Sequence, residues 1–376
     1  MKKLFISILA VAAAVACTKT NVDFEQPAEI GFAPVASMSS KAALNTATYP
    51  TDQPIGIWSN YAGDVNPATV SDYTKFSTKY LDNVKFINRT TVVEDKETAT
   101  ANWGGATPYY WPTNGSLVFA GYSIPKDGNT ITTAEDGDAA DAQTVSYDFT
   151  SDEMVFKNYE QSLNTANTFD LLWFGRTADS YNYRNASTAV PVKFNHALSW
   201  ITIQVKGEGT AIAGGNAWAV ESVKLLSVVK KGTATLTGTT ASWALSTAVA
   251  DKGDMAVFTI PDTGSDTSSD IKQAQKLTAD AAVIEDVTGG TVVLPQTPVK
   301  LEVSYSYKTP AGSPITEKKE VELTLDAKNS DNNVWKPGYH YTYTLTFKSN
   351  EILVAPSVET WIDSPGNGTG HDVTVE

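Results

Sequence analysis

The chain has 376 residues and a formal net charge of −14 at pH 7. Nucleic acid and anionic membrane surfaces repel a chain this acidic, so we expect neither as a partner. Its only cysteine, Cys17, leaves no thiol for a disulfide within the chain, for dithiol redox chemistry or for a thiolate metal cluster.

The first predicted element is an export signal followed by a site of lipid attachment. Two lysines precede an uncharged stretch from residue 4 to residue 15, which suits a signal peptide and is too short to cross a bilayer. Small residues then lead into Cys17, and the arrangement resembles a bacterial lipobox. We expect residues 1–16 to be removed and Cys17 to carry a diacylglyceryl group. The alternative is a plain secretory signal that is cut near Ala16, with Cys17 left as a free or buried thiol.

Alternation of apolar and polar residues predicts antiparallel strands along most of the chain. The clearest run is "YHYTYTLTF", residues 339–347, in which three tyrosines, Leu345 and Phe347 share one face. Residues 200–206, 301–308 and 321–326 alternate in the same way. Each run is half apolar, as expected for a strand with one buried face. Turn sequences separate the runs, namely "NWGG", "KDGN", "EDGD", "KKGT", "DTGSD", "TGG" and "KPGY". The pattern predicts an all-β protein built from antiparallel β-sandwiches.

Evidence for helices is confined to two stretches. Residues 151–163, capped by Ser151, and residues 268–283 are compatible with short helices or with long loops. Residues 127–143 and 261–270 have the composition of loops.

The polar, turn-like stretch at residues 176–190 is the expected domain boundary. It divides the chain after the signal into domains at 17–188 and 189–376, each the size of a β-sandwich.

Motifs that carry chemistry are missing from the sequence. The three histidines, His196, His340 and His371, have no metal-binding spacing, and neither HExxH nor GxSxG occurs. "DGDAAD", which begins at Asp136, departs from a calcium loop at its sixth and twelfth positions. We therefore expect no catalytic residue, no cofactor and no metal site, and we predict that the protein is not an enzyme. His196 is interpreted as a hydrogen-bonded residue at the domain junction, and His340 as a solvent-exposed residue on the polar face of its strand.

Nine tryptophans and sixteen tyrosines raise a second possibility, since flat aromatic faces stack on sugars. Most of them fall in predicted strands, as do Trp58 and Trp200, where core packing is the expected role. An exposed aromatic platform would favour a glycan-binding protein.

Four stretches in order resemble the fimbrillin family, the lipoprotein pilus subunits of certain Gram-negative anaerobes. They are "PYYWPTNGSLVFAGYSIP" (108–125), "VPVKFNHALSWITIQV" (190–205), "WKPGYHYTYTLTF" (335–347) and "ILVAPSVETWIDS" (352–364). The resemblance implies two tandem antiparallel β-sandwich domains of transthyretin-like type, little helix and no catalysis. It also implies an outer-membrane lipoprotein at the cell surface or in a fimbrium, with the lipid as its only membrane contact.

The resemblance further implies assembly by β-strand exchange. In some family members a protease removes the first strand, and the terminal strand of another subunit fills the groove. The family's cleavage arginine has no counterpart here, and Lys41, which follows "AEIGFAPV", is the candidate processing site. The expected partners are other pilus subunits or a second copy of this chain, together with a host or bacterial surface receptor or glycan. The alternative function is a lipid-anchored glycan-binding module of a polysaccharide-uptake system.

Overall fold

The computed structural model describes residues 28–35, 49, 53–90, 101–125, 132–133, 142–182, 189–209, 218–259, 275–284, 290–307, 317–327, 333–348 and 351–360. Within these ranges there is no α-helix, and the short 3-10 turns are η1 (Tyr73–Lys75), η2 (Thr165–Asn167) and η5 (Val249–Asp251). The strands of the first half are β1 (Phe32–Val35), β2 (Ile55–Ala62), β3 (Thr78–Thr90), β4 (Ala101–Gly105), β5 (Ser116–Ser123), β6 (Thr132–Thr133), β7 (Thr144–Asp148), β8 (Glu153–Glu160) and β9 (Leu172–Phe174). Those of the second half are β10 (Val190–Lys193), β11 (Asn195–His196), β12 (Ser199–Gly207), β13 (Trp218–Val229), β14 (Lys231–Thr237), β15 (Thr240–Leu245), β16 (Lys252–Thr259), β17 (Gln275–Lys276), β18 (Ala282–Val283), β19 (Thr291–Val293), β20 (Lys300–Tyr307), β21 (Glu317–Thr324), β22 (Tyr339–Phe347) and β23 (Ile352–Thr360).

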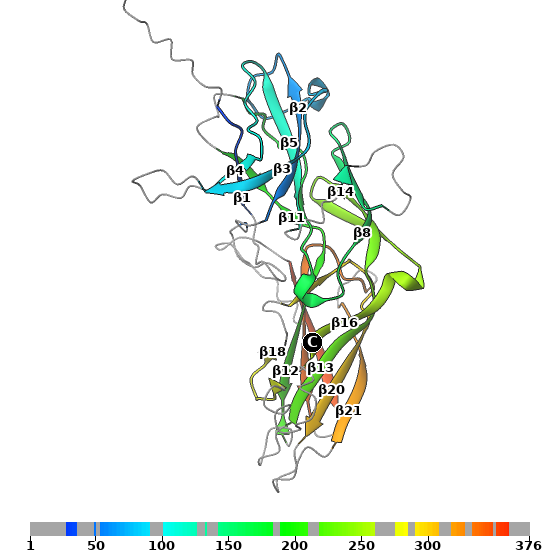
Figure 1. Cartoon of the computed structure of the whole chain (residues 1–376). Helices are drawn as coiled ribbons and strands as arrows, with labels where there is room; N and C mark the ends of the chain where they lie inside the picture. The colour runs from blue at the N-terminus through cyan, green and yellow to red at the C-terminus, as the bar shows by residue number, and fades with distance from the viewer. Residues whose placement is uncertain are drawn as a thin grey trace, which may run out of the picture.

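An eight-stranded sheet forms the upper part of the molecule in Figure 1, in the order β10-β1-β4-β3-β2-β5-β9-β11. Adjacent strands run antiparallel, except that β1 and β10 are parallel. β10 and β11 lie at opposite ends of this order although only Phe194 separates them in the chain, so the sheet curls until its ends meet. All residues of β5 are buried, because this strand runs through the middle of the first sandwich.

A five-stranded sheet, β15-β14-β8-β7-β6, packs beside the first and shares its core. The Phe156 ring on β8 meets the Tyr122 ring on β5 edge-on, with centroids 5.3 Å apart. Strands β14 and β15 follow β13 in the chain, yet Ala234 and Leu236 of β14 are buried in this first core. A hairpin from the second half of the chain therefore completes the first sandwich.

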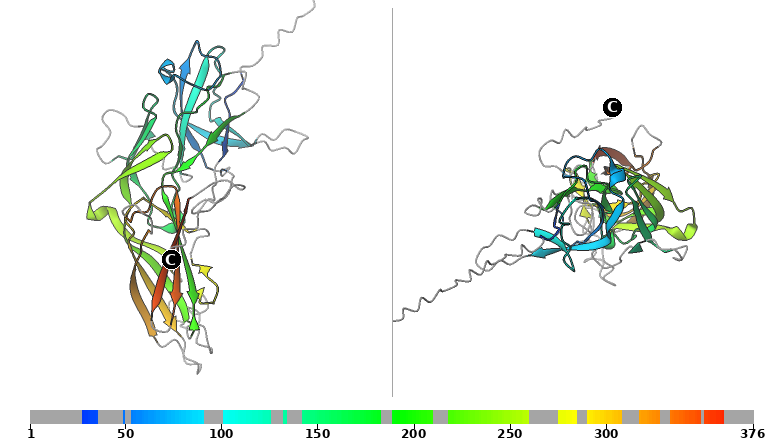
Figure 2. Two further views of the ribbon diagram at one scale, coloured as in Figure 1. Left: turned by 180° about the vertical axis from the view of Figure 1, so that it is seen from behind. Right: turned by 90° about the horizontal axis from the view of Figure 1, so that it is seen from above.

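The second sandwich lies below the first in both side views (Figures 1 and 2). It consists of the sheet β18-β12-β22-β23 and the sheet β16-β13-β20-β21. The apolar faces predicted for residues 200–206 and 339–347 are confirmed, since Ile201, Ile203, Tyr341 and Tyr343 are all buried between the sheets. The predicted all-β, sandwich-type architecture with little helix is thus confirmed.

Some local predictions are wrong. Residues 153–160 form strand β8, because Met154 and Phe156 face the core and the strand pairs with both β7 and β14. Within residues 268–283 the described part holds β17 and β18 and no helix. "NWGG" lies in strand β4, and "KKGT" lies in β14 apart from Lys230, so sheet pairing overrides the turn preference of glycine in both. "KPGY" is a turn as predicted, with Gly338 at φ +73°.

The division of the chain at residues 188 and 189 stays a prediction, because residues 183–188 lie outside the described ranges. The residues just N-terminal to this division are hydrogen-bonded to the first sandwich. The Thr177 N–H donates to Phe119 O at 2.8 Å, and the Tyr181 N–H donates to Leu117 O at 2.9 Å.

Candidate functional site

The first candidate site is the position of β1 in the first sandwich, which we call its seat. Ile30 and Phe32 are completely buried. The Phe32 ring meets the rings of Phe86 and Phe119 edge-on, at centroid distances of 5.0 and 5.2 Å. β1 is therefore a short strand whose side chains complete the core of a much larger sheet.

The backbone of β1 is held mainly on one side. It pairs in parallel with β10 from Phe32↔Val190 to Val35↔Lys193, and with β4 only at Phe32↔Trp103. Each of the two parallel strands contains a proline, Pro34 in β1 and Pro191 in β10. Because proline has no N–H to donate, the ladder between these strands is weaker than its length suggests.

The residues just before β1 are fixed by three contacts. The Trp111 N–H donates to Ala28 O at 3.0 Å, and the Ile30 N–H donates to Tyr109 O at 2.7 Å. The Arg89 guanidinium donates to the Glu29 carboxylate at 2.6 Å, with about 28–29% of each side chain exposed. Gly104 leaves room for this ion pair, since a Cβ at that position would lie 2.9 Å from Glu29 Oε1. Residues 28–30 are thus held by short contacts to the first sandwich.

Tyr49, downstream of β1, is buried at the edge of the same core. Its ring meets the Trp103 ring edge-on at 5.1 Å, and its hydroxyl donates to Pro54 O at 3.1 Å. Burial, followed by the nearby Asp170 carboxylate, raises the pKa of the Tyr49 phenol well above its ordinary value. The hydroxyl therefore stays neutral and keeps its hydrogen bond.

The terminal strand β23 belongs to the second sandwich of its own chain. It pairs antiparallel with β22 from Phe347↔Ile352 to Tyr339↔Thr360, and Ile352, Val354 and Val358 pack against the second core. Among the described residues β23 is the last strand of its sheet, with β22 as its one neighbour.

The two modification sites predicted from sequence, Cys17 and Lys41, lie outside the described residues, and so do Trp361, His371 and the calcium-like stretch at Asp136. In the described ranges no group of three or more His, Cys, Asp or Glu side chains could hold a metal ion. In the same ranges no helix is long and apolar enough to cross a bilayer.

His196 is a hydrogen-bonded residue between the two sandwiches, as the sequence predicted. Its Nδ1 lies 2.7 Å from Asp170 Oδ2, and each side chain is only 2% exposed. Sequence reasoning missed Asp170, because a carboxylate 26 positions away gives no local signal.

The prediction that His340 is solvent-exposed is wrong. Its ring is half-buried and stacks on the Trp200 indole with centroids 3.5 Å apart. Its Nε2 lies 2.9 Å from Thr202 Oγ1, so the ring covers the neighbouring strand β12.

The tryptophans within the described ranges do not form an exposed platform. Trp58, Trp103, Trp111, Trp173, Trp200 and Trp335 are buried, and Trp218 and Trp243 are half-buried. Their main role is core packing, as the strand registers predicted.

The described residues thus form two β-sandwich cores, with a short N-terminal strand in the first and an edge strand, β23, in the second. The model of the fimbrillin-like family matches residues 43–361, so the chain belongs to the fimbrillin-like family. This membership indicates an exported, cell-surface protein with a structural or adhesive role, and no curated protein matches the chain.

Of the solved structures reported below, the first supports this fold. A fimbrial protein from Bacteroides vulgatus ATCC 8482 is similar at 16% identity with a TM-score of 0.55, covering 89% of this chain and 100% of that chain. A putative cell adhesion protein from Bacteroides uniformis ATCC 8492, at 16% identity, covers 89% of this chain and 99% of its own with a TM-score of 0.44. The fimbrial anchor protein Mfa2 from Porphyromonas gingivalis is similar at 10% identity with a TM-score of 0.29, and the match covers 89% of this chain and 96% of that chain.

Proposed function

We propose that this protein is a lipid-anchored structural or adhesive pilus subunit that assembles by β-strand exchange. The lipid is carried by Cys17, cleavage at Lys41 releases β1, and the terminal segment of a second subunit, from Ile352 onward, fills the vacated seat. The partner is another pilus subunit or a second copy of this chain. The observation that carries the proposal is β1 itself, because a short strand with a weak backbone ladder fills a deep part of the core.

Removal of β1 leaves a cavity in the core and an unpaired strand edge, and both favour binding of a replacement strand. Loss of a buried phenylalanine side chain alone costs about 3–5 kcal/mol, and Ile30 leaves with Phe32. An incoming strand restores the buried apolar contacts and pairs with the freed backbone of β10. Until it arrives, the open edge is prone to aggregation, which is why removal is best coupled to assembly.

The proposed donor can leave its own sandwich at limited cost. Within the part of the chain that the structure describes, β23 pairs with one neighbouring strand, and its core-facing side chains are half-buried. β1, by contrast, places the completely buried Phe32 in the core, whereas Ala33 and Pro34 are half-buried, so the incoming strand has to refill this deep position.

The test is assembly of purified protein. A specific protease site is placed at Lys41, the chain is cut, and cut and full-length protein are mixed and sized by multi-angle light scattering. We expect multimers from the mixture and monomers from full-length protein alone. Deleting residues 364–376 should leave the monomer folded and abolish the multimers. Cut and full-length protein that stay monomeric at high concentration would overturn strand exchange.

Lipid attachment is tested separately in cells. Cys17→Ser should move the protein from the membrane fraction to soluble fractions, because a diacylglyceryl group with a further acyl chain anchors stably and the rest of the chain does not. Cys17→Ser protein that stays with membranes at the level of the unaltered chain would contradict the anchor.

A further inference from the structure

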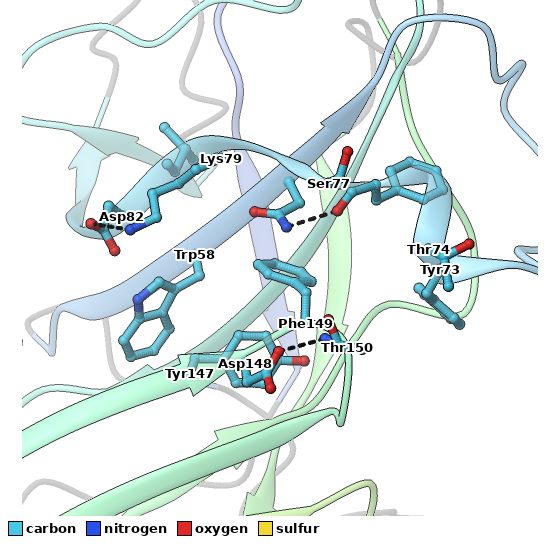
Figure 3. A pocket seen from close by; sticks show the side chains of 13 residues that line it. Trp58, Tyr73, Thr74, Ser77, Lys79, Asp82, Tyr147, Asp148, Phe149 and Thr150 are labelled. Carbon is cyan, nitrogen blue, oxygen red and sulfur yellow. Dashed lines mark hydrogen bonds and ion pairs between the residues drawn. The ribbon is translucent and has the colours of Figure 1, made fainter.

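The first sandwich carries a cleft of about 480 Å³ that strand exchange does not use. It lies between β2 and β3 on one side and the turn that joins β7 to β8 on the other (Figure 3). Its volume is within the range of about 300–1,000 Å³ that is typical of small-molecule sites. We call it the η1 cleft, because the residues around η1 close one end of it.

The floor of the η1 cleft is aromatic. The Trp58 and Tyr147 ring centroids are 5.8 Å apart, and the Tyr147 and Phe149 centroids are 4.8 Å apart. Trp58 and Phe149 are buried and Tyr147 is half-buried, so Tyr147 is the most accessible of the three rings. Figure 3 shows all three grouped on the inner side of the cleft.

The rim of the η1 cleft is polar. Lys79 Nζ contacts Asp82 Oδ2 at 2.8 Å, with both side chains largely exposed. The Asp148 carboxylate lies on the opposite wall. The Thr150 N–H donates to it at 2.7 Å, and this hydrogen bond holds the pKa of Asp148 below its usual value. The hydroxyl of Thr150 is exposed beside it. The opening thus offers one ammonium, two carboxylates and a hydroxyl around an apolar floor.

Contacts behind the floor fix the walls of the cleft. The Arg176 guanidinium donates to Phe149 O at 2.6 Å and lies 4.0 Å from the centroid of the Tyr73 ring. The Tyr147 hydroxyl donates to Asp152 Oδ1 at 2.6 Å, and the same oxygen accepts the backbone N–H of Arg176 at 2.8 Å. Side chains held in this way are pre-organised, so a ligand does not have to order them when it binds.

We propose that the η1 cleft binds a neutral hexopyranose unit of a surface glycan. A sugar ring has an apolar face that suits the accessible part of the Tyr147 ring, which the buried Trp58 and Phe149 rings support from behind. It also has an edge of hydroxyl groups that Asp82, Asp148 and Lys79 can bond. Two carboxylates and a net charge of −14 disfavour acidic sugars. The polar rim disfavours a purely apolar ligand. The inference names a ligand for the adhesive part of the proposed function and rests on it only in requiring an exposed cell-surface protein.

The test is calorimetric titration of the uncut full-length chain, so its outcome is independent of strand exchange. The probes are the methyl glycosides of α-mannose, β-galactose and β-glucose, with N-acetylneuraminic acid as a charged comparison. We expect at least one neutral glycoside to bind with a Kd of about 1 mM or lower, which is appropriate for a single sugar ring. N-acetylneuraminic acid should bind at least about tenfold more weakly, a difference of about 1.4 kcal/mol.

Two variants locate the binding. Thr150→Trp, at an exposed rim position, should block the cleft, and Asp82→Asn should weaken binding about tenfold by removing a charged acceptor. Thr324→Trp, at an exposed position on β21 of the second sandwich, is the matched control and should bind like the unaltered chain.

No binding by any neutral glycoside overturns the proposal, as does binding that Thr150→Trp leaves unchanged. Tighter binding of the tripeptide Gly-Lys-Gly in competition with the sugars also overturns it and assigns the cleft to a peptide.

Discussion

The Phe32 ring lies edge-on to the Phe119 ring with centroids 5.2 Å apart, and this contact joins β1 to the central strand β5 of the first sandwich. β1 has only four residues, but its buried side chain reaches the middle of the core. The stability of the first sandwich and the position of β1 are therefore coupled.

Phe32→Ala should destabilise the protein by about 3–5 kcal/mol, because it leaves a cavity between Phe86 and Phe119. Urea unfolding followed by tryptophan fluorescence measures the change in midpoint. Leu353→Ala is the control, since Leu353 is 42% exposed on an edge strand, and it should change stability by no more than about 0.5 kcal/mol. Equal effects of the two substitutions would show that β1 is not part of the core.

Asp170→Ala should destabilise the junction between the sandwiches by about 2–3 kcal/mol, because it leaves the His196 ring buried without this partner. Differential scanning calorimetry measures the effect. The matched control is Glu322→Ala, which removes a pair with Lys300 of the same 2.7 Å length whose side chains are more than half exposed. Screening by water limits its effect to about 0.5 kcal/mol. Similar losses in the two variants would contradict a structural role for the buried pair.

The sequence predicts elements well where one face is buried and the alternation is unbroken, as in residues 339–347. The sequence does not predict strand β8, because Asn158 adopts a positive φ of 52°. After Met154 and Phe156 the next buried position is therefore Tyr159, three residues on, and not residue 158. The positive-φ residue breaks the period-two pattern that marks a strand.

The candidate sites are harder to predict from the sequence, because their residues are far apart in the chain and come together only in the folded protein. The walls of the η1 cleft come from residues near Trp58 and Lys79 and from the turn at Asp148, which are far apart in the chain and carry no shared motif. The seat of β1 combines β3, β5 and β10. The sequence indicated a first strand there only through the family resemblance.

High pH should unfold the protein cooperatively. Burial is the first cause that raises the phenol pKa of Tyr147, Tyr159 and Tyr343 above the ordinary value of 10.0. The unfolded chain therefore loses these protons first, so their contribution to stability is complete below pH 10 and declines as the pH rises above it. Absorbance at the tyrosinate band and far-UV circular dichroism should change together. Full tyrosinate formation in a chain that keeps its strand signal would contradict the burial of these phenols.

Trypsin should cut first in the stretch from Arg176 to Ala189, and at Arg184 in preference to Arg176. The Arg176 side chain is 19% exposed and bonded to the β7–β8 turn, which protects it. Denaturing gels should show two fragments of roughly 18 to 21 kDa, at about 110 Da per residue. The fragments should co-elute in gel filtration, because β14 of the second fragment pairs with β8 of the first. Fragments that separate without denaturant would show that this pairing does not hold the sandwiches together.

A peptide with the sequence of residues 28–35, "AEIGFAPV", should bind to protein that has been cut at Lys41 and freed of its first strand in mild denaturant. The peptide supplies Ile30 and Phe32 to the vacated core, and its backbone pairs with β10. At about 100 times its Kd it should raise the stability by about 2.7 kcal/mol, which corresponds to a Tm increase of about 5–10 °C for domains of this size.

The matched control peptide carries the Phe32→Ala substitution and is otherwise identical. It keeps the backbone pairing with β10 and loses the ring between Phe86 and Phe119, so it should give less than half of the Tm increase. Equal rescue by both peptides would mean that backbone pairing alone holds β1, and a terminal strand would then need no large apolar residue to replace it. Absence of rescue by either peptide would mean that the seat collapses when β1 leaves, and an incoming strand could then fill it only during removal of β1.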